Sequence, residues 1–183
     1  TAFYQAFGLE IAADAGEPIS LVLGVSPVFR AVVGTRVSPP GRPPEMSPFN
    51  TFFDNPASRP HETHASRLEL KRVRATSEGR RASIAVGDLS MGPFAGEIVF
   101  TFYPGSRLFR LEAAVSTREE RRAFTYEAGL VGEASSWRRA AWMDTGGRIQ
   151  HADLGAASAH RPIAVRHRAI VAEGEAGSLA CWA

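Results

Sequence analysis

The chain has 183 residues, a mass of 19.7 kDa and a formal net charge of +2, with 44% hydrophobic and 22% charged residues. This length fits one domain with one hydrophobic core, and no apolar run approaches the roughly 20 residues that a membrane-spanning helix needs. Lys71 is the only lysine among 21 basic residues. We attribute this scarcity of lysine to the coding bias of a GC-rich bacterial genome. The small charge excess gives no evidence for nucleic acid, so neither nucleic acid nor a membrane is expected as a partner.

The first third of the chain predicts strands and then a long loop. The loop, Ser38–Ala65, has no apolar periodicity and contains seven of the twelve prolines. A connection of this length inside a compact domain is usually functional or disordered, and its prolines favour order. Strand character precedes and follows the loop, in segments rich in apolar and β-branched residues: Ala2–Ala12, Ile19–Val25, Val28–Val37, Arg67–Ala75 and Arg81–Val86.

Gly96–Thr117 predicts a β-hairpin around which the other strands are arranged. Apolar residues alternate along both arms, which is the period-two pattern of half-buried strands. The turn is Tyr103-Pro104-Gly105-Ser106, in which proline presets the backbone and glycine tolerates a positive φ. The alternating residues are Ile98, Phe100 and Phe102 in the first arm and Phe109, Leu111, Ala113 and Val115 in the second.

The last third predicts more short strands. Thr117–Arg122 supports at most one helical turn, and Asp144-Thr145-Gly146-Gly147 is typical of a hairpin turn. The flanking strands are Phe124–Leu130, Trp137–Met143, Arg148–Asp153, Ile163–Val171 and Leu179–Trp182. About ten strands with little or no helix predict an all-β chain, an antiparallel β-sandwich resembling a supersandwich meander. Residues 1–183 are expected to form a single sandwich domain, either as a whole protein or as a fragment of a larger one.

The candidate site lies in the Ser38–Ala65 loop. Its segment Phe49–Pro56 mixes three aromatic rings with amides and a carboxylate, which is the composition that holds a sugar by ring stacking and hydroxyl hydrogen bonds. The expected substrate-binding residues are Asn50, Asp54, Asn55 and Arg59, and the expected acid/base residues are His61 and His64. The alternative is that the aromatic residues only pack the loop against the sandwich and bind no ligand.

Other ionisable groups were weighed for chemistry. His61-Glu62-Thr63-His64 offers metal ligands but is not an HExxH motif and has no second ligand pair, so neither a metal nor a cofactor is expected. Strand carboxylates on a concave sheet face are further acid/base candidates, namely Glu97, Glu112 and Glu127. The densest basic stretch is interrupted by acids and has no interleaved aromatics, which favours a solvated strand face over a polyanion site; it comprises Arg67, Lys71, Arg72, Arg74, Arg80 and Arg81.

The hairpin series, the loop segment PFNTFFDNP and the strand AFTYEAGL resemble the galactose mutarotase-like β-supersandwich domains of carbohydrate-active enzymes. The resemblance implies a carbohydrate context and assigns no catalytic residue. Two functions follow. The first is a carbohydrate-active or carbohydrate-binding domain that uses the loop and a concave sheet face. The second is a non-catalytic structural or interaction module that contacts other domains of the same protein.

Overall fold

The computed structural model describes residues 8–11, 19–23, 26–35, 60–131, 137–154, 162–175 and 177–182. These residues form strands joined by turns, and their one helical segment is the 3₁₀ turn Arg166–Arg168. The all-β expectation is confirmed. The described part contains no helix that is long and apolar enough to cross a membrane.

The chain divides into two compact units. The central unit is Pro27–Gly129, and the terminal unit joins Thr1–Ser26 to Leu130–Ala183. The single domain expected over residues 1–183 stays a prediction.

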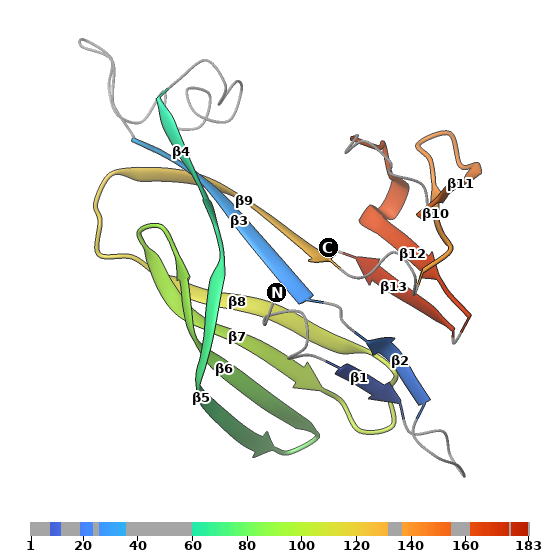
Figure 1. Ribbon diagram of the computed structural model, residues 1–183, viewed down its shortest axis with the longest axis horizontal. Helices are drawn as coiled ribbons and strands as arrows, with labels where there is room; N and C mark the ends of the chain where they lie inside the picture. Colours follow the sequence, from blue (N-terminus) through green and yellow to red (C-terminus); the bar gives the residue numbers. More distant parts are fainter. Residues whose placement is uncertain are drawn as a thin grey trace. The chain divides into compact units, whose positions relative to one another are not determined.

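A four-stranded antiparallel meander dominates the central unit. It consists of β5 (Arg67–Glu78), β6 (Arg81–Met91), β7 (Phe94–Phe102) and β8 (Phe109–Ser116), which pair in chain order (Figure 1). Each strand is joined to the next by a short turn, as expected for strands with alternating apolar residues. The cross-strand register puts an apolar face on one side of the sheet and a face rich in charged residues on the other.

The second sheet of the central unit has the strand order β4-β3-β9. Its strands are β3 (Ser26–Thr35), β4 (His61–Ala65) and β9 (Arg122–Val131). Alternate residues of β3 are buried, because one face of this strand points into the core. The edge-to-face contact of Phe94 on β7 with Phe124 on β9, at 5.1 Å between ring centroids, joins the two sheets.

The core of the central unit lies at one end of the apolar face of the meander. Ile98 and Leu89 are its largest fully buried side chains. The further buried apolar residues come from both sheets: Phe29, Ala31, Val33, Leu68, Ala85, Val86, Met91, Phe94 and Ala123. Phe100 and Leu111, predicted as central hairpin residues, are only half-buried because they lie nearer the β7–β8 turn.

The predicted hairpin is confirmed as β7 and β8. Its turn closes with a hydrogen bond that the Ser106 amide donates to the Tyr103 carbonyl at 3.0 Å. Gly105 has a φ of +76°, a conformation that glycine adopts without steric cost. The sequence pattern therefore located both the turn and the alternation of the arms correctly.

The terminal unit contains a two-stranded and a four-stranded sheet. β1 (Gly8–Ile11) pairs with β2 (Ile19–Leu23), and the larger sheet has the order β11-β10-β12-β13. The strands of the larger sheet are β10 (Arg139–Met143), β11 (Ile149–Asp153), β12 (Ala169–Glu173) and β13 (Ser178–Trp182). Buried Trp137 is the centre of its core, with Leu130, Leu154, Ala172 and Leu179 packed around it.

Three expected elements differ in the structure. The Ser38–Ala65 loop was predicted to extend to Ala65, but its last five residues form strand β4. Pairing with β3 stabilises this strand, although the local sequence has no apolar periodicity that would predict one. No helical turn follows Thr117; its hydroxyl instead accepts a hydrogen bond from the Glu119 amide at 3.1 Å. The strand expected over Ile163–Val171 begins only at Ala169, after the 3₁₀ turn.

Candidate functional site

The residues predicted to bind substrate cannot be placed, whereas the two histidines can. Asn50, Asp54, Asn55 and Arg59 lie outside the described residues. His61 and His64 lie on the short strand β4.

Strand β4 does not bring the two histidines together. His61 is opposite Gly34 of β3, and His64 is opposite Ala31. Residues three apart on a strand point to opposite faces. His61 is exposed, while His64 shares its face with the buried Ala31. The two imidazoles therefore do not form one acid/base pair through β4 alone.

His64 packs against the turn between β6 and β7. A Cβ built on Gly92 would lie 2.4 Å from two atoms of the His64 ring, and Gly92 has a φ of +58°. Only glycine fits there. The Nε2 atom of His64 is shielded from solvent, and the nearest carboxylate oxygen, Oε2 of Glu62, is 3.3 Å away. This histidine fills space between two elements, and the described residues contain no group of three or more potential ligands that could hold a metal ion.

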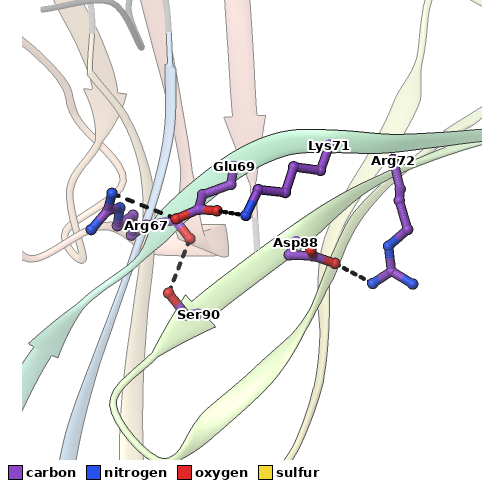
Figure 2. Close-up of polar contacts among 6 residues, drawn as sticks. All are labelled: Arg67, Glu69, Lys71, Arg72, Asp88 and Ser90. Carbon is purple, nitrogen blue, oxygen red and sulfur yellow. Dashed lines mark hydrogen bonds and ion pairs between the residues drawn. The ribbon is translucent and has the colours of Figure 1, made fainter.

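The basic stretch on β5 is largely neutralised by neighbouring acids (Figure 2). Glu69 contacts Lys71 at 2.5 Å and Arg67 at 3.5 Å. The hydrogen bond from Lys71, together with the two positive charges, lowers the pKa of the Glu69 carboxyl. Arg72 forms an ion pair with Asp88 of β6.

Two more members of the stretch have acidic partners. Arg74 contacts Glu97 of β7 at 2.7 Å, and Arg81 contacts Glu78 at 2.5 Å. Of the six basic residues, Arg80 is the one to which the described residues supply no acidic partner. Exposed ion pairs of this kind contribute little stability, because solvent screens them and two long side chains must be ordered to form each one. Six cations share four carboxylates, because Arg67 and Lys71 both contact Glu69 and Arg80 has no acidic partner among the described residues, so the group keeps a net charge of +2. The arrangement of exposed ion pairs fits the expected solvated face.

An open depression lies where the charged groups of β5, β6 and β7 meet. Its volume is about 630 Å³. Small residues of β7 and β8, namely Ala95, Gly96 and Ala114, form its floor, and Arg72, Asp88, Glu97 and Ser116 provide polar groups around it. The other lining residues are Val115 and Leu89, and the side chain of Leu89 is buried in the core.

Irregular strand pairing produces this depression. The register shifts between Leu68 and Arg72 on β5, so that three residues of β5 face Asp88 alone. A second shift places Gly87 and Asp88 of β6 opposite Glu97 of β7. Bulges reorient side chains locally, and they are common beside functional sites. Here the two shifts bring the Asp88 and Glu97 carboxylates to the same part of the sheet.

Gly96 allows the close approach of β7 and β8 beneath the depression. A Cβ at this position would lie 1.9 Å from the carbonyl oxygen of Ala114, so any other residue would push the two strands apart. With Ala95 and Ala114 beside it, the glycine leaves the surface hollow rather than filled by side chains.

Sequence reasoning identified Glu97 as a strand carboxylate on a sheet face but did not identify Asp88. The available signal was Gly87 within a strand pattern, since an isolated glycine in a strand often marks a bulge. Glu112 lies on the same face as Glu97 and pairs with Arg110 at 2.7 Å, outside the depression lining. Glu127 is exposed on β9, where it pairs with Arg30 at 2.5 Å.

Comparisons with known proteins identify no relative. No protein-family model matches the sequence, and no match was found among curated proteins or solved structures.

Proposed function

We propose that this chain is a saccharide-binding β-sandwich module, and that the depression on the β5–β8 meander is its binding surface. The observation that supports the proposal is the convergence of Arg72, Asp88 and Glu97 on a floor of small apolar residues. The volume lies within the range of about 300–1,000 Å³ typical of small-molecule sites. A mono- or disaccharide fits this size.

The charged groups suit hydroxyl recognition. Ionised carboxylates accept hydrogen bonds from sugar hydroxyls, and a guanidinium donates several in a fixed plane. The ion pairs of Arg72 with Asp88 and of Arg74 with Glu97 hold these side chains in place before a ligand arrives. Such preorganisation reduces the conformational entropy lost on binding. The apolar floor can contact the C–H face of a sugar ring.

The proposal is limited to binding. Acid/base roles for His61 and His64 stay predictions, as does substrate contact by Asn50, Asp54, Asn55 and Arg59. The resemblance to galactose mutarotase-like domains, noted from the sequence, agrees with a carbohydrate ligand and also stays a prediction.

A titration of neutral saccharides followed by NMR tests the proposal. We expect chemical-shift changes confined to residues of β5–β8 that surround the depression. Substituting both Asp88→Asn and Glu97→Gln should weaken binding at least about tenfold, because two charge-assisted hydrogen bonds are lost. Glu112→Gln is the matched control, since it changes a carboxylate on the same face outside the depression. Absence of shifts with every saccharide, or equal affinity of the double variant, would refute the proposal.

A second candidate, the interaction module, is favoured by exposed apolar residues on the opposite face of the same sheet. Val73 and Ile84 point to this face on neighbouring strands and are 66% and 37% exposed. Leu108 and Tyr103, in the β7–β8 turn, are also exposed. Contiguous apolar surface commonly marks a protein–protein contact.

The interaction function makes a different experimental prediction. Sedimentation at increasing concentration should reveal self-association, or bis-ANS should bind to the exposed face. Replacing Val73 by Asp should reduce the self-association or dye binding that is observed while leaving the melting temperature nearly unchanged, because this side chain is 66% exposed. A monomer that binds no dye would exclude this candidate.

A further inference from the structure

We infer that the outer edge of β5 is a docking site for an extended acidic peptide segment of another protein, which adds to the meander as a further strand. This edge lies outside the depression, and its use does not depend on saccharide binding. Three features of β5 support the inference: its place in the sheet, the direction of its arginines and the surplus of positive charge around it.

β5 is an edge strand that is exposed on both faces. Among the described strands it pairs with β6 alone, so β6 lies on one side of it and its other side forms the outer edge of the meander (Figure 1). Every residue from Leu70 to Glu78 is exposed, whereas β8, the other edge strand, contains several half-buried residues. This exposed stretch is about 30 Å long, and its outward N–H and C=O groups can pair with an extended peptide.

The two central arginines of β5 leave the outer edge uncovered. Arg72 forms an ion pair with Asp88 of β6, and Arg74 reaches across β6 to Glu97 of β7 at 2.7 Å. Both guanidinium groups therefore lie over the middle of the sheet and not beyond its edge. On the opposite face, Val73 is 66% exposed at the edge. A strand added there would cover Val73 and remove its apolar surface from water.

The charge of β5 and of its turn to β6 favours an acidic partner. The six cations of this region exceed the four carboxylates that they contact, which leaves the net charge of +2. One surplus charge lies near the start of the exposed stretch, where Arg67 and Lys71 share Glu69. The other lies at the far end, on exposed Arg80 in the turn, to which the described residues supply no carboxylate. A complementary peptide therefore needs acidic residues near both of its ends.

The same surplus argues against a second copy of this chain as the occupant. Two β5 edges that pair with each other bring a charge of +2 against an equal charge, and like charges on adjacent strands are destabilising. An acidic strand instead combines backbone pairing with charge attraction.

The probe for the test is a fluorescein-labelled synthetic peptide with aspartates at both ends of an alternating threonine–valine segment, matched in length to Leu70–Glu78. Fluorescence anisotropy measures its binding to the intact chain. We expect it to bind at least about fivefold more tightly than the same peptide with lysine in place of aspartate, because two opposite unit charges about 4 Å apart attract each other by about that factor even in water. The difference should shrink at about 1 M salt, where the Debye length is about 3 Å. Equal binding of the two peptides at low salt would overturn the inference.

Two further measurements test whether the peptide pairs as a strand. Hydrogen exchange should show that amides of β5 become protected when the acidic peptide binds, because the outward N–H groups then donate to the peptide backbone. An acidic peptide with proline at alternate positions lacks the N–H groups for pairing and should bind at least about tenfold more weakly. Unchanged exchange of β5, or full affinity of the proline peptide, would show that charge alone attracts the peptide and would contradict strand addition.

A pair of double variants tests whether the charge acts at this edge. Lys71→Gln/Arg80→Gln removes the surplus of two charges outside the depression and should weaken binding of the acidic peptide at least about fivefold. The matched control is Arg107→Gln/Arg110→Gln, which removes the same charge beside and on β8 and should leave the affinity unchanged. All four side chains are exposed, so both variants should keep the wild-type melting temperature. Equal weakening by the two variants would refute docking at β5. Self-association that protects β5 amides without peptide would identify a second copy as the occupant and would refute it as well.

Discussion

Ile98→Ala should destabilise the central unit strongly. Ile98 is fully buried on β7 and pairs with Val86 and Ala113 on the neighbouring strands. The substitution removes three carbon groups, which at about 0.8 kcal/mol each correspond to about 2.4 kcal/mol of lost burial. The cavity left behind raises the cost, so that we expect a total of about 3–4 kcal/mol.

Urea unfolding followed by far-ultraviolet circular dichroism is the appropriate assay. All three tryptophans, Trp137, Trp142 and Trp182, belong to the terminal unit, so their fluorescence does not report directly on the site of the change. Hydrogen exchange of peptides from β6 and β7 provides the local measurement.

The matched control is Val73→Ala on the same face of the sheet. Its side chain is 66% exposed, and the expected loss is below about 0.5 kcal/mol. A loss below about 1 kcal/mol for Ile98→Ala, or equal losses at the two positions, would show that the core is not centred on Ile98.

Two further predictions concern the strands and turns. Gly96→Ala should lower the urea midpoint by an amount equivalent to about 1–3 kcal/mol, because its Cβ would overlap the Ala114 carbonyl oxygen; a wild-type midpoint would refute the close approach of these strands. Asp144 should make stability pH-dependent, since hydrogen bonds from the Arg148 amide at 2.9 Å and the Gln150 side chain at 2.8 Å lower the pKa of its carboxyl below the ordinary value of 3.8. Its contribution is therefore present above that value and is lost as the pH falls through the lower pKa of the folded state. Asp144→Asn should flatten the melting temperature below about pH 4, whereas an unchanged acid dependence would contradict this role.

Local sequence patterns were sufficient to predict the fold class and the main turns. The recurrence of large apolar residues at every second position, Ile98, Phe100 and Phe102, is a local property of an extended chain, and so it identified a half-buried strand without knowledge of its partners. The Tyr103–Ser106 and Asp144–Gly147 turns were recognisable for the same reason, because their backbone conformations depend on the residues at those positions.

Which polar groups meet depends on how the strands pair. Arg72 and Asp88 are 16 residues apart, and Arg74 and Glu97 are 23 apart, so their pairing depends on the register of three strands. The register shifts twice near Asp88. A shift of one residue moves a side chain to the other face of the sheet, so these shifts determine which side chains meet.

The histidines illustrate the same limit. His61 and His64 are close in sequence, and each was an acid/base candidate. Whether the segment between them is a loop or a strand determines which way the two side chains point. Pairing of β4 with β3 made this segment a strand and placed the imidazoles on opposite faces. Local composition identifies residues whose chemistry suits a binding or catalytic site. Whether these residues lie together depends on cross-strand contacts, which no short segment of the sequence specifies.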